Sequence, residues 1–524
     1  MFSLTAALRR AAQLNPRGDA LRQGARHQPW GSFPDRVARL AGGLAQLGVG
    51  PGDRVAVLAL NSAYYYEFYF AVAWVGGVFV PVNTRLAGPE IVHWLTDSES
   101  KVLCVDAAFA ETIEGLRSEL PSLETVVTLG EVALPGSATH WEALAQANPM
   151  EDAGRSNNDL AGLFYTGGTT GRSKGVMLSQ QNLLVNAMQA APILQLQPGD
   201  RCLHVAPMFH IADWCMAVGM LLMAGTNYFL PAFEPTEVMA TIEREKIQRM
   251  LMVPTMINRV VHDPTLANYD LSSLEGVLYG ASPMPEAVIR QALSVLPHTR
   301  FYQAYGQTEA APIITMLAPE YHTVDPASPF AGKLTSAGQA IPGVEVAILD
   351  EHDRPVPRGE VGEVCARGPN VMLGYRNLPE QTAKTLASGW LHTGDGGRLD
   401  EDGFLTIVDR VKDMIISGGE NVYSAEVENV LMLHPAVDQC AVIGVPDADW
   451  GERVHAIVVL SQDGAAAPPT EADLVAHCRS HIAGFKVPRS LTFRREPLPL
   501  SGAGKILKTE LRAPFWKDTD RNVS

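Results

Sequence analysis

The sequence predicts an α/β protein with a large N-terminal domain and a smaller α+β domain at the C-terminal end. Its 524 residues exceed the length of one ordinary domain. Strand-like and helix-like segments alternate over the first 130 residues, which is typical of a largely parallel sheet covered by helices. The segment 409–413, "DRVKD", precedes a remainder that is itself the size of a domain. We therefore place the domains at 1–409 and 410–524, joined by a short hinge.

Successive segments of the N-terminal part have the hydrophobic pattern of alternating elements. Val37, Leu40, Leu44 and Leu47 recur at helical spacing and predict an amphipathic helix. The apolar run "RVAVLAL" at 54–60 predicts a buried strand. The alternation then continues, with helices expected at 64–76 and 90–99 and strands at 78–82 and 101–106.

The C-terminal part shows the same two patterns in a shorter stretch. Helices are expected at 424–435 and 471–482, and strands at 439–445 and 454–460. Thr470 and Asp473 have the spacing of a capping box, which predicts the start of the second helix. These segments suffice for a compact α+β unit.

Composition excludes several classes of protein. A hydrophobic content of 46% allows a large core, and a net charge of −16 argues against nucleic acid or an anionic membrane as the main partner. The six cysteines are scattered without a C-x-x-C pair, which disfavours disulfides and zinc and favours reduced cytosolic thiols. The N-terminus lacks a secretory pattern, and the apolar stretches 68–82 and 214–224 are too short or too interrupted to span a membrane. We expect a cytoplasmic protein with no integral membrane segment.

The segment 165–175, "YTGGTTGRSKG", predicts a loop that holds an anion. It follows a short apolar run, and its glycines allow backbone N–H groups to approach a phosphate. Lys174 is preceded by Ser173 and followed by Gly175, so the loop is not the P-loop pattern G-x-x-x-x-G-K-[ST]. A different phosphate chemistry is indicated.

Four further motifs follow this loop in order. They are "YGQTE" at 305–309, "GWLHTGD" at 389–395, "DRVKDMIISGGENVYSAEVE" at 409–428 and "SGAGKILK" at 501–508. With these motifs the chain resembles the acyl-adenylate-forming superfamily, which includes acyl- and aryl-CoA synthetases, peptide-synthetase adenylation domains and luciferases. The resemblance extends to about residue 510. It implies an N-terminal domain of three subdomains, a mobile C-terminal domain, and the substrates ATP, coenzyme A and a small carboxylic acid, with Mg²⁺ as cofactor.

The resemblance also assigns roles to individual residues. Lys505 matches the lysine that catalyses adenylation, and Glu309 the residue that carries Mg²⁺. Asp395 matches the aspartate that binds ribose, with Arg410 as its partner and Lys412 at the hinge. The other nucleotide-binding and coenzyme A positions are Thr166, Gly167, Gly168, Thr169, Thr170, Gly171 and Lys174 around the phosphates, Gly280, Ala281, Ser282, Tyr305 and Gly306 around adenine, Thr308 at the α-phosphate, Ile407, and Gly418 and Gly419 at the pantetheine channel. Gly167 and Ser173 depart from the family pattern, which often has Ser or Thr and Pro there.

The segment around "PMFHIADWC" is expected to border the acyl group. His210 is assigned to the carboxylate pocket, and Trp214 and Met216 to substrate binding, with Met208 and Met220 nearby. Flexible methionines favour an aliphatic or thioether acyl chain, so the main expectation is a medium- or long-chain fatty acid. The aryl acids (coumarate- or cinnamate-like), short acids (methylthiopropionate-like) and the loading of a carrier protein remain alternatives.

Two further readings are weaker. A non-catalytic nucleotide- or acyl-CoA-binding protein is disfavoured because Lys505, Glu309 and Asp395 are all present. A luciferase-like oxidation is also compatible with the motifs. The adenylation enzymes that activate amino acids have an acidic residue just after the position of His210. In this chain Ile211 stands there, although Asp213 is close by. The sequence does not indicate the oligomeric state, and a homodimer is compatible with it.

Overall fold

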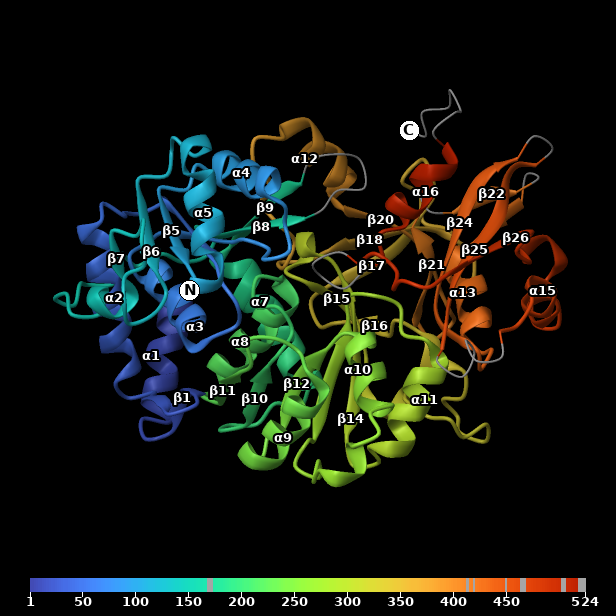
Figure 1. Ribbon diagram of the computed structural model, residues 1–524, viewed down its shortest axis with the longest axis horizontal. Coiled ribbons are helices and arrows are strands. Elements are labelled where there is room, and N and C mark those ends of the chain that lie inside the picture. The colour runs from blue at the N-terminus through green and yellow to red at the C-terminus, as the bar shows by residue number, and fades with distance from the viewer. Residues whose placement is uncertain are drawn as a thin grey trace.

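The computed structural model describes residues 1–166, 173–410, 414–417, 420–447, 450–461, 468–500 and 506–516. Over these residues the chain forms four sheets, with the blue N-terminal elements and the orange and red C-terminal elements at opposite ends of Figure 1. The larger N-terminal part and the smaller C-terminal part confirm the predicted α/β fold class.

The first sheet has a parallel centre, as the alternating pattern predicted. Among the described residues its order is β19 (Gly374–Tyr375), β9 (Lys174–Ser179), β8 (Leu160–Thr166), β4 (Val78–Pro81), β3 (Arg54–Leu58), β5 (Val102–Val105), β6 (Thr125–Thr128) and β7 (Thr139–His140). β3 pairs in parallel with β4 and β5, whereas β9 is antiparallel to both of its neighbours, β8 and β19. The antiparallel edge leads toward the phosphate loop.

Helices cover both faces of this sheet. They are α1 (Leu4–Leu14), α2 (Phe33–Gln46), α3 (Ala63–Trp74), α4 (Gly88–Asp97), α5 (Ala110–Leu116) and α6 (Trp141–Leu144). The helices α1, α2 and α3 contribute to the largest core, and α4 and α5 to a separate core on the other face. The strands and helices that we predicted between residues 37 and 106 are confirmed, with small shifts at their ends.

The second sheet has nine strands in the described part of the chain. Its order is β16 (Gln339–Ala340), β15 (Ile313–Leu317), β14 (Arg300–Gly306), β13 (Gly276–Gly280), β12 (Arg249–Met252), β10 (Arg201–His204), β11 (Thr226–Phe229), β1 (Asp19–Gln23) and β2 (Arg26–Pro29). The strands from β14 to β1 are parallel, and β15 turns back against β14. Its helices are α7 (Gln180–Ile193), α8 (Ile211–Met223), α9 (Pro235–Glu245), α10 (Pro254–Val261) and α11 (Glu286–Val295).

The third sheet is antiparallel and leads toward the C-terminal part. It consists of β17 (Glu345–Leu349), β18 (Gly362–Arg367), β20 (Leu391–Leu399) and β21 (Leu405–Arg410), with α12 (Pro379–Thr385) between β19 and β20. The proposed domain boundary falls at the end of β21. Lys412, at the expected hinge, lies outside the described residues.

The C-terminal part is an α+β unit with helices on both faces of one sheet. The order is β23 (Glu420–Val422), β22 (Ile415–Ser417), β25 (Gly451–Leu460) and β24 (Val437–Asp447), and β26 (Ser490–Arg494) pairs with β25. α13 (Ser424–Met432) and α15 (Glu471–Arg479) pack on one face, and α16 (Lys508–Trp516) on the other. Thr470 and Asp473 form the expected capping box of α15.

Two expectations from composition can be compared with the structure. All six cysteines are buried free thiols, which agrees with the absence of a disulfide framework. None of the helices in the described segments is both long and apolar enough to cross a membrane.

Candidate active site

The adenine and ribose motifs meet at one point. The Tyr305 hydroxyl donates to Oδ2 of Asp395 at 2.8 Å, although the two residues are 90 positions apart. Tyr305 lies near the carboxyl end of β14, and Asp395 lies in β20 directly opposite Arg410 of β21. The side chain of Arg410 is outside the described part, so its pairing with Asp395 stays a prediction. Ile407 lies opposite Gly397 in the same pair of strands.

The adenine-side glycines lie at the same edge of the second sheet. β13 and β14 are parallel and pair Gly280 with Ala304, so their carboxyl ends bring "GAS" and "YGQTE" together. A Cβ on Gly280 would lie 2.2 Å from the carbonyl oxygen of Ala304, and one on Gly306 would lie 2.0 Å from that of Pro312. Both glycines are therefore required by close backbone approach, and Ala281 (φ +67°) and Ser282 follow directly.

Glu309 is a buried carboxylate held by a residue that sequence reasoning missed. It belongs to the short turn Thr308–Ala310 and is 8% exposed. The Tyr375 hydroxyl donates to Oε1 of Glu309 at 2.7 Å, and burial together with the adjacent Glu309 charge raises the pKa of Tyr375. The Lys174 ammonium lies 4.8 Å from the centre of the Tyr375 ring. Tyr375 thus joins the expected metal ligand to the expected phosphate lysine.

The ends of the phosphate loop are adjacent. β8 and β9 pair Thr166 with Lys174, and a ring nitrogen of His93 lies 3.1 Å from the carbonyl oxygen of Ser173. Gly167, Gly168, Thr169, Thr170 and Gly171 lie outside the described residues, as do Gly418, Gly419 and Lys505. Their assigned roles therefore stay predictions.

His210 is placed at the start of a helix rather than within it. It is the N-cap of α8, and its Nδ1 accepts from the backbone N–H of Ala212 at 3.2 Å. In the neutral ring this leaves the hydrogen on Nε2. Asn61 holds the preceding segment, because its side chain accepts from the N–H of Met208 and donates to the carbonyl of Ala206, both at 2.8 Å.

The expected acyl-pocket residues beyond His210 are buried. Trp214 is 1% exposed, and its ring centre lies 4.4 Å from that of Tyr69 and 5.1 Å from that of Phe79. Met216, on the same helix, is 2% exposed and packs in a different core cluster. Contact of these two side chains with a substrate stays a prediction.

A buried ion pair joins β10 to α8. Nδ1 of His204 lies 2.9 Å from Oδ2 of Asp213, and Nε2 lies 2.8 Å from Oδ1 of Asn227. The Asn227 amide donates to Ala20, which orients its oxygen toward the histidine. Burial alone would lower the pKa of His204, but the Asp213 carboxylate holds it well above the usual value. The histidine is therefore an imidazolium.

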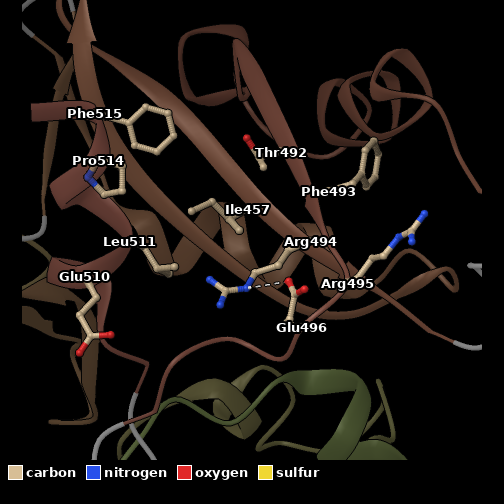
Figure 2. Close-up of a pocket in the computed structure, with 10 residues that line it drawn as sticks. All are labelled: Ile457, Thr492, Phe493, Arg494, Arg495, Glu496, Glu510, Leu511, Pro514 and Phe515. Carbon is tan, nitrogen blue, oxygen red and sulfur yellow. Dashed lines mark ion pairs between the residues drawn. The ribbon is translucent and has the colours of Figure 1, made fainter.

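A cavity lies elsewhere, in the C-terminal part. An open cavity of about 510 Å³ is lined by residues of β25, β26 and α16 and of the segment after β26, which Figure 2 shows as sticks. In it, Nε of Arg494 lies 3.8 Å from Oε2 of Glu496. None of the described site residues predicted from the sequence lines it.

These features define an α/β protein in which the residues assigned to adenine and ribose meet at one edge of a sheet, and those assigned to the metal ion and the phosphates meet at Tyr375. Residues 8–376 match the family of the AMP-binding enzyme, and residues 426–505 match the AMP-binding enzyme C-terminal domain. The chain therefore belongs to the AMP-binding enzyme family, among the AMP-forming acyl-CoA ligases.

Relatives and solved structures are similar over nearly the whole chain. Feruloyl-CoA synthase of an Amycolatopsis species is 41% identical over 511 residues, covering 97% of this chain and 98% of its own. Medium/long-chain-fatty-acid–CoA ligase FadD8 of Mycobacterium tuberculosis is 36% identical, covering 94% and 86%. The anthranilate CoA ligase AuaEII, solved with anthranoyl-AMP, has a TM-score of 0.89 at 27% identity and covers 98% and 97%.

Proposed function

We propose that this protein is an ATP-dependent CoA ligase for an aromatic carboxylic acid of the hydroxycinnamate class. The observation that carries the proposal is the 41% identity to feruloyl-CoA synthase over 97% of the chain. The fatty-acid preference expected from the methionines becomes the second candidate, favoured by the 36% identity to FadD8.

The packing of the expected acyl wall supports an aromatic acid. Met208, Met216 and Met220 are at most 2% exposed and lie in two different core clusters. The Trp214 ring is interlocked with those of Tyr69 and Phe79. Close-packed rings are less adaptable than flexible methionine side chains, so a wall built on the Trp214 ring suits a flat acid of fixed length better than a flexible chain.

The first half-reaction joins the acid to the nucleotide. A carboxylate oxygen attacks the α-phosphorus of ATP, the bond to the bridging oxygen breaks, and pyrophosphate leaves with the electron pair. Tyr305 and Asp395 would hold adenine and ribose, and Lys174 and Lys505 would oppose the negative charge of the phosphates and the attacking carboxylate. The attack joins two anions, which is why cations are needed on both sides.

Glu309 fits the metal ion that this chemistry uses. Carboxylate oxygens are ligands that Mg²⁺ prefers, and the Tyr375 hydroxyl holds one Glu309 oxygen in place. A bound Mg²⁺ would neutralise charge on the phosphate oxygens. Glu309 would bind it while Thr308 contacts the α-phosphate.

The second half-reaction transfers the acyl group. The thiol of coenzyme A gives its proton to water, and its sulfur attacks the acyl carbon. The bond from that carbon to the phosphate oxygen breaks, and AMP leaves with the electron pair to give the thioester. Gly418 and Gly419 are the positions at which we expect the pantetheine arm to pass. His210, with its hydrogen on Nε2, would border the carboxylate in both steps.

A pyrophosphate-release assay with thioester detection by mass tests the proposal. The protein is given ATP, Mg²⁺ and coenzyme A with ferulate, coumarate, cinnamate, benzoate, octanoate, dodecanoate or methylthiopropionate. We expect the highest kcat/KM for a hydroxycinnamate, and a raised KM for ATP with every acid in Asp395→Asn. A higher kcat/KM for octanoate or dodecanoate would replace the proposal by the fatty-acid reading.

The acyl acceptor is tested separately. Fatty acid–[acyl-carrier-protein] ligase ScoC of Streptomyces coeruleorubidus is 38% identical and covers 93% of this chain, so a carrier protein is the competing acceptor. Coenzyme A and a phosphopantetheinylated carrier protein are offered in parallel with the preferred acid. Thioester formed on the carrier alone would overturn the CoA-ligase assignment.

A further inference from the structure

The strand that carries Asp395 bulges away from its neighbour. In the pairing of β18 with β20, Cys365 lies opposite His392 and Glu363 lies opposite Gly396. An advance of two residues along β18 therefore corresponds to four residues along β20. The residues between these pairs on β20 are Thr393, Gly394 and Asp395, and Gly394 has φ +72°. A bulge next to an active site re-aims a side chain, and here the re-aimed side chain is the Asp395 carboxylate.

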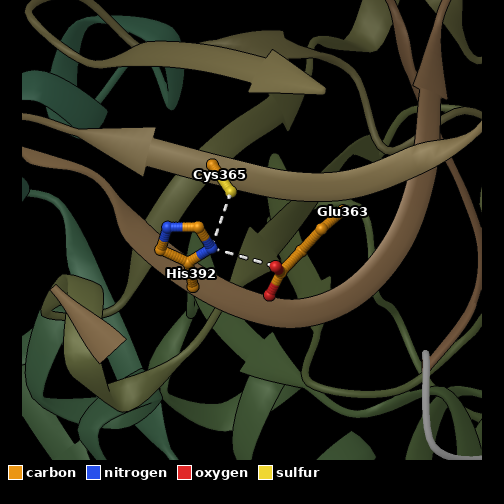
Figure 3. Close-up of side chains that lie close together, drawn as sticks. All are labelled: Glu363, Cys365 and His392. Atoms are coloured by element: carbon orange, nitrogen blue, oxygen red, sulfur yellow. Dashed lines mark hydrogen bonds and ion pairs between the residues drawn. The ribbon is translucent and has the colours of Figure 1, made fainter. Parts of the chain in front are cut away.

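The Glu363 carboxylate closes the bulge from the neighbouring strand. Its Oε1 accepts from the backbone N–H of Gly394, and its Oε2 accepts from Nδ1 of His392, both at 2.9 Å. Figure 3 shows His392 lying between Glu363 and Cys365. Thr393 completes the arrangement, donating to the carbonyl of Val364 at 2.6 Å and accepting from the N–H of Asp395 at 3.1 Å.

We propose that Glu363 is a positioning residue for nucleotide recognition, fixing the 392–395 bulge so that Asp395 accepts from the ribose hydroxyls. The inference rests on the proposed function, in which Asp395 binds the ribose of ATP. A carboxylate is suited to this task because its two oxygens accept from both ends of the bulge at once. Hydrogen bonds to a charged acceptor are also stronger than those between neutral groups.

The same cluster could be read as a metal site, since the donor atoms of Glu363, Cys365 and His392 lie within 4.8 Å of one another. The contacts favour hydrogen bonding. Nδ1 of His392 is at hydrogen-bond distance from Glu363, and Sγ of Cys365 is 3.5 Å from the same nitrogen. Burial and the nearby carboxylates of Glu363 and Asp353 raise the pKa of the Cys365 thiol, which disfavours the thiolate that a metal would need.

The test compares nucleotides that differ only in the ribose. AMP, 2′-deoxy-AMP and 3′-deoxy-AMP are titrated by calorimetry into wild type, Glu363→Ala, Glu363→Gln and Asp395→Asn, without any acid. We expect wild type to prefer AMP. Glu363→Ala should weaken AMP binding about tenfold or more and weaken each deoxynucleotide less, because each deoxynucleotide keeps only one of the two ribose hydroxyls. Glu363→Gln can still accept from the N–H of Gly394, so its affinity for AMP should lie between those of wild type and Glu363→Ala.

Glu345→Gln is the matched control. Glu345 lies on the adjacent strand β17, is exposed, and pairs with Arg367 across the sheet. It should keep the wild-type preference for AMP. An equal loss for all three nucleotides in Glu363→Ala would show that Glu363 only supports the fold.

The remaining outcomes separate this inference from the proposed function. If wild type binds no AMP, the proposed function fails. If wild type binds AMP without preferring it over the deoxynucleotides, the ribose role of Asp395 is overturned together with that of Glu363. If wild type prefers AMP and Glu363→Ala keeps the preference, only the role of Glu363 is overturned. Stoichiometric retention of added Zn²⁺ by wild type and its loss in Cys365→Ser would replace the hydrogen-bonded cluster by a metal site.

Discussion

The hydroxyl of Tyr375 donates to the carboxylate of Glu309 at 2.7 Å, and the two residues come from segments 66 positions apart. The Tyr375 ring also lies beneath the Lys174 ammonium, at 4.8 Å. One tyrosine therefore contacts the expected metal ligand with its hydroxyl and the expected phosphate lysine with its ring. Its position is set by β19, which pairs Tyr375 with Val176 of β9.

We expect Tyr375→Phe to lower kcat and to raise the Mg²⁺ concentration needed for half-maximal rate. The two effects together should lower the rate at limiting Mg²⁺ by about tenfold. The change removes one hydrogen bond to a buried charged group and keeps the ring under Lys174. Initial rates of pyrophosphate release across a Mg²⁺ titration measure the effect. Tyr64→Phe is the control, because Tyr64 also lies beneath a cation, Arg26 at 4.2 Å, and is not among the predicted site residues. An unchanged Mg²⁺ profile in Tyr375→Phe would separate Tyr375 from metal binding.

The Tyr305–Asp395 hydrogen bond gives a second prediction. Tyr305→Phe keeps a ring to stack on adenine but no longer orients the Asp395 carboxylate, so the KM for ATP should rise several-fold. Asp395→Asn should raise it further, because the amide cannot accept with both atoms. The double variant should have about the same KM for ATP as Asp395→Asn alone, because both changes affect one interaction. Additive losses would show that the two side chains bind ATP independently.

Trp214 gives a third prediction, about both stability and substrate choice. Trp214→Ala removes a fully buried ring and should cost about 3–5 kcal/mol of the free energy of unfolding. Trp214→Phe keeps most of the packing, so it isolates the effect on the acid. We expect its preference among cinnamates and C3 to C16 acids to shift while the KM for ATP is nearly unchanged. An unaltered acid profile in Trp214→Phe would place the residue in the general core.

The sequence predicted those features that depend on local pattern. The alternation of apolar runs located α2, β3, α3, β4, α4 and β5, and the capping box at Thr470 marked the start of α15. The meeting of "YGQTE" with "HTGD" was predictable from the motif set. These features need only spacing and residue type, which the sequence displays directly.

The contacts between distant segments were not predictable in this way. Tyr375 reaches Glu309 because β19 adds to the edge of the first sheet, and Glu363 reaches Gly394 because β20 bulges against β18. His204 meets Asp213 only because β10 and α8 pack together. A periodicity reports which face of one element is buried, whereas register and bulges decide which side chains meet across elements.

The buried pair of His204 and Asp213 gives the last prediction, on the pH dependence of stability. The folded-state pKa of His204 is raised, so the folded protein binds a proton that the unfolded chain releases above its ordinary pKa of about 6.5. The stabilisation is fully present below about pH 6.5 and is lost as the pH rises toward the folded pKa, by at most about 1.4 kcal/mol per pH unit. His204→Gln should remove this slope between pH 6.5 and 9, and Asp213→Asn should cost about 3–5 kcal/mol because it leaves a buried cation. Urea unfolding at each pH measures both. A slope in His204→Gln equal to that of wild type would assign the pH dependence to other groups.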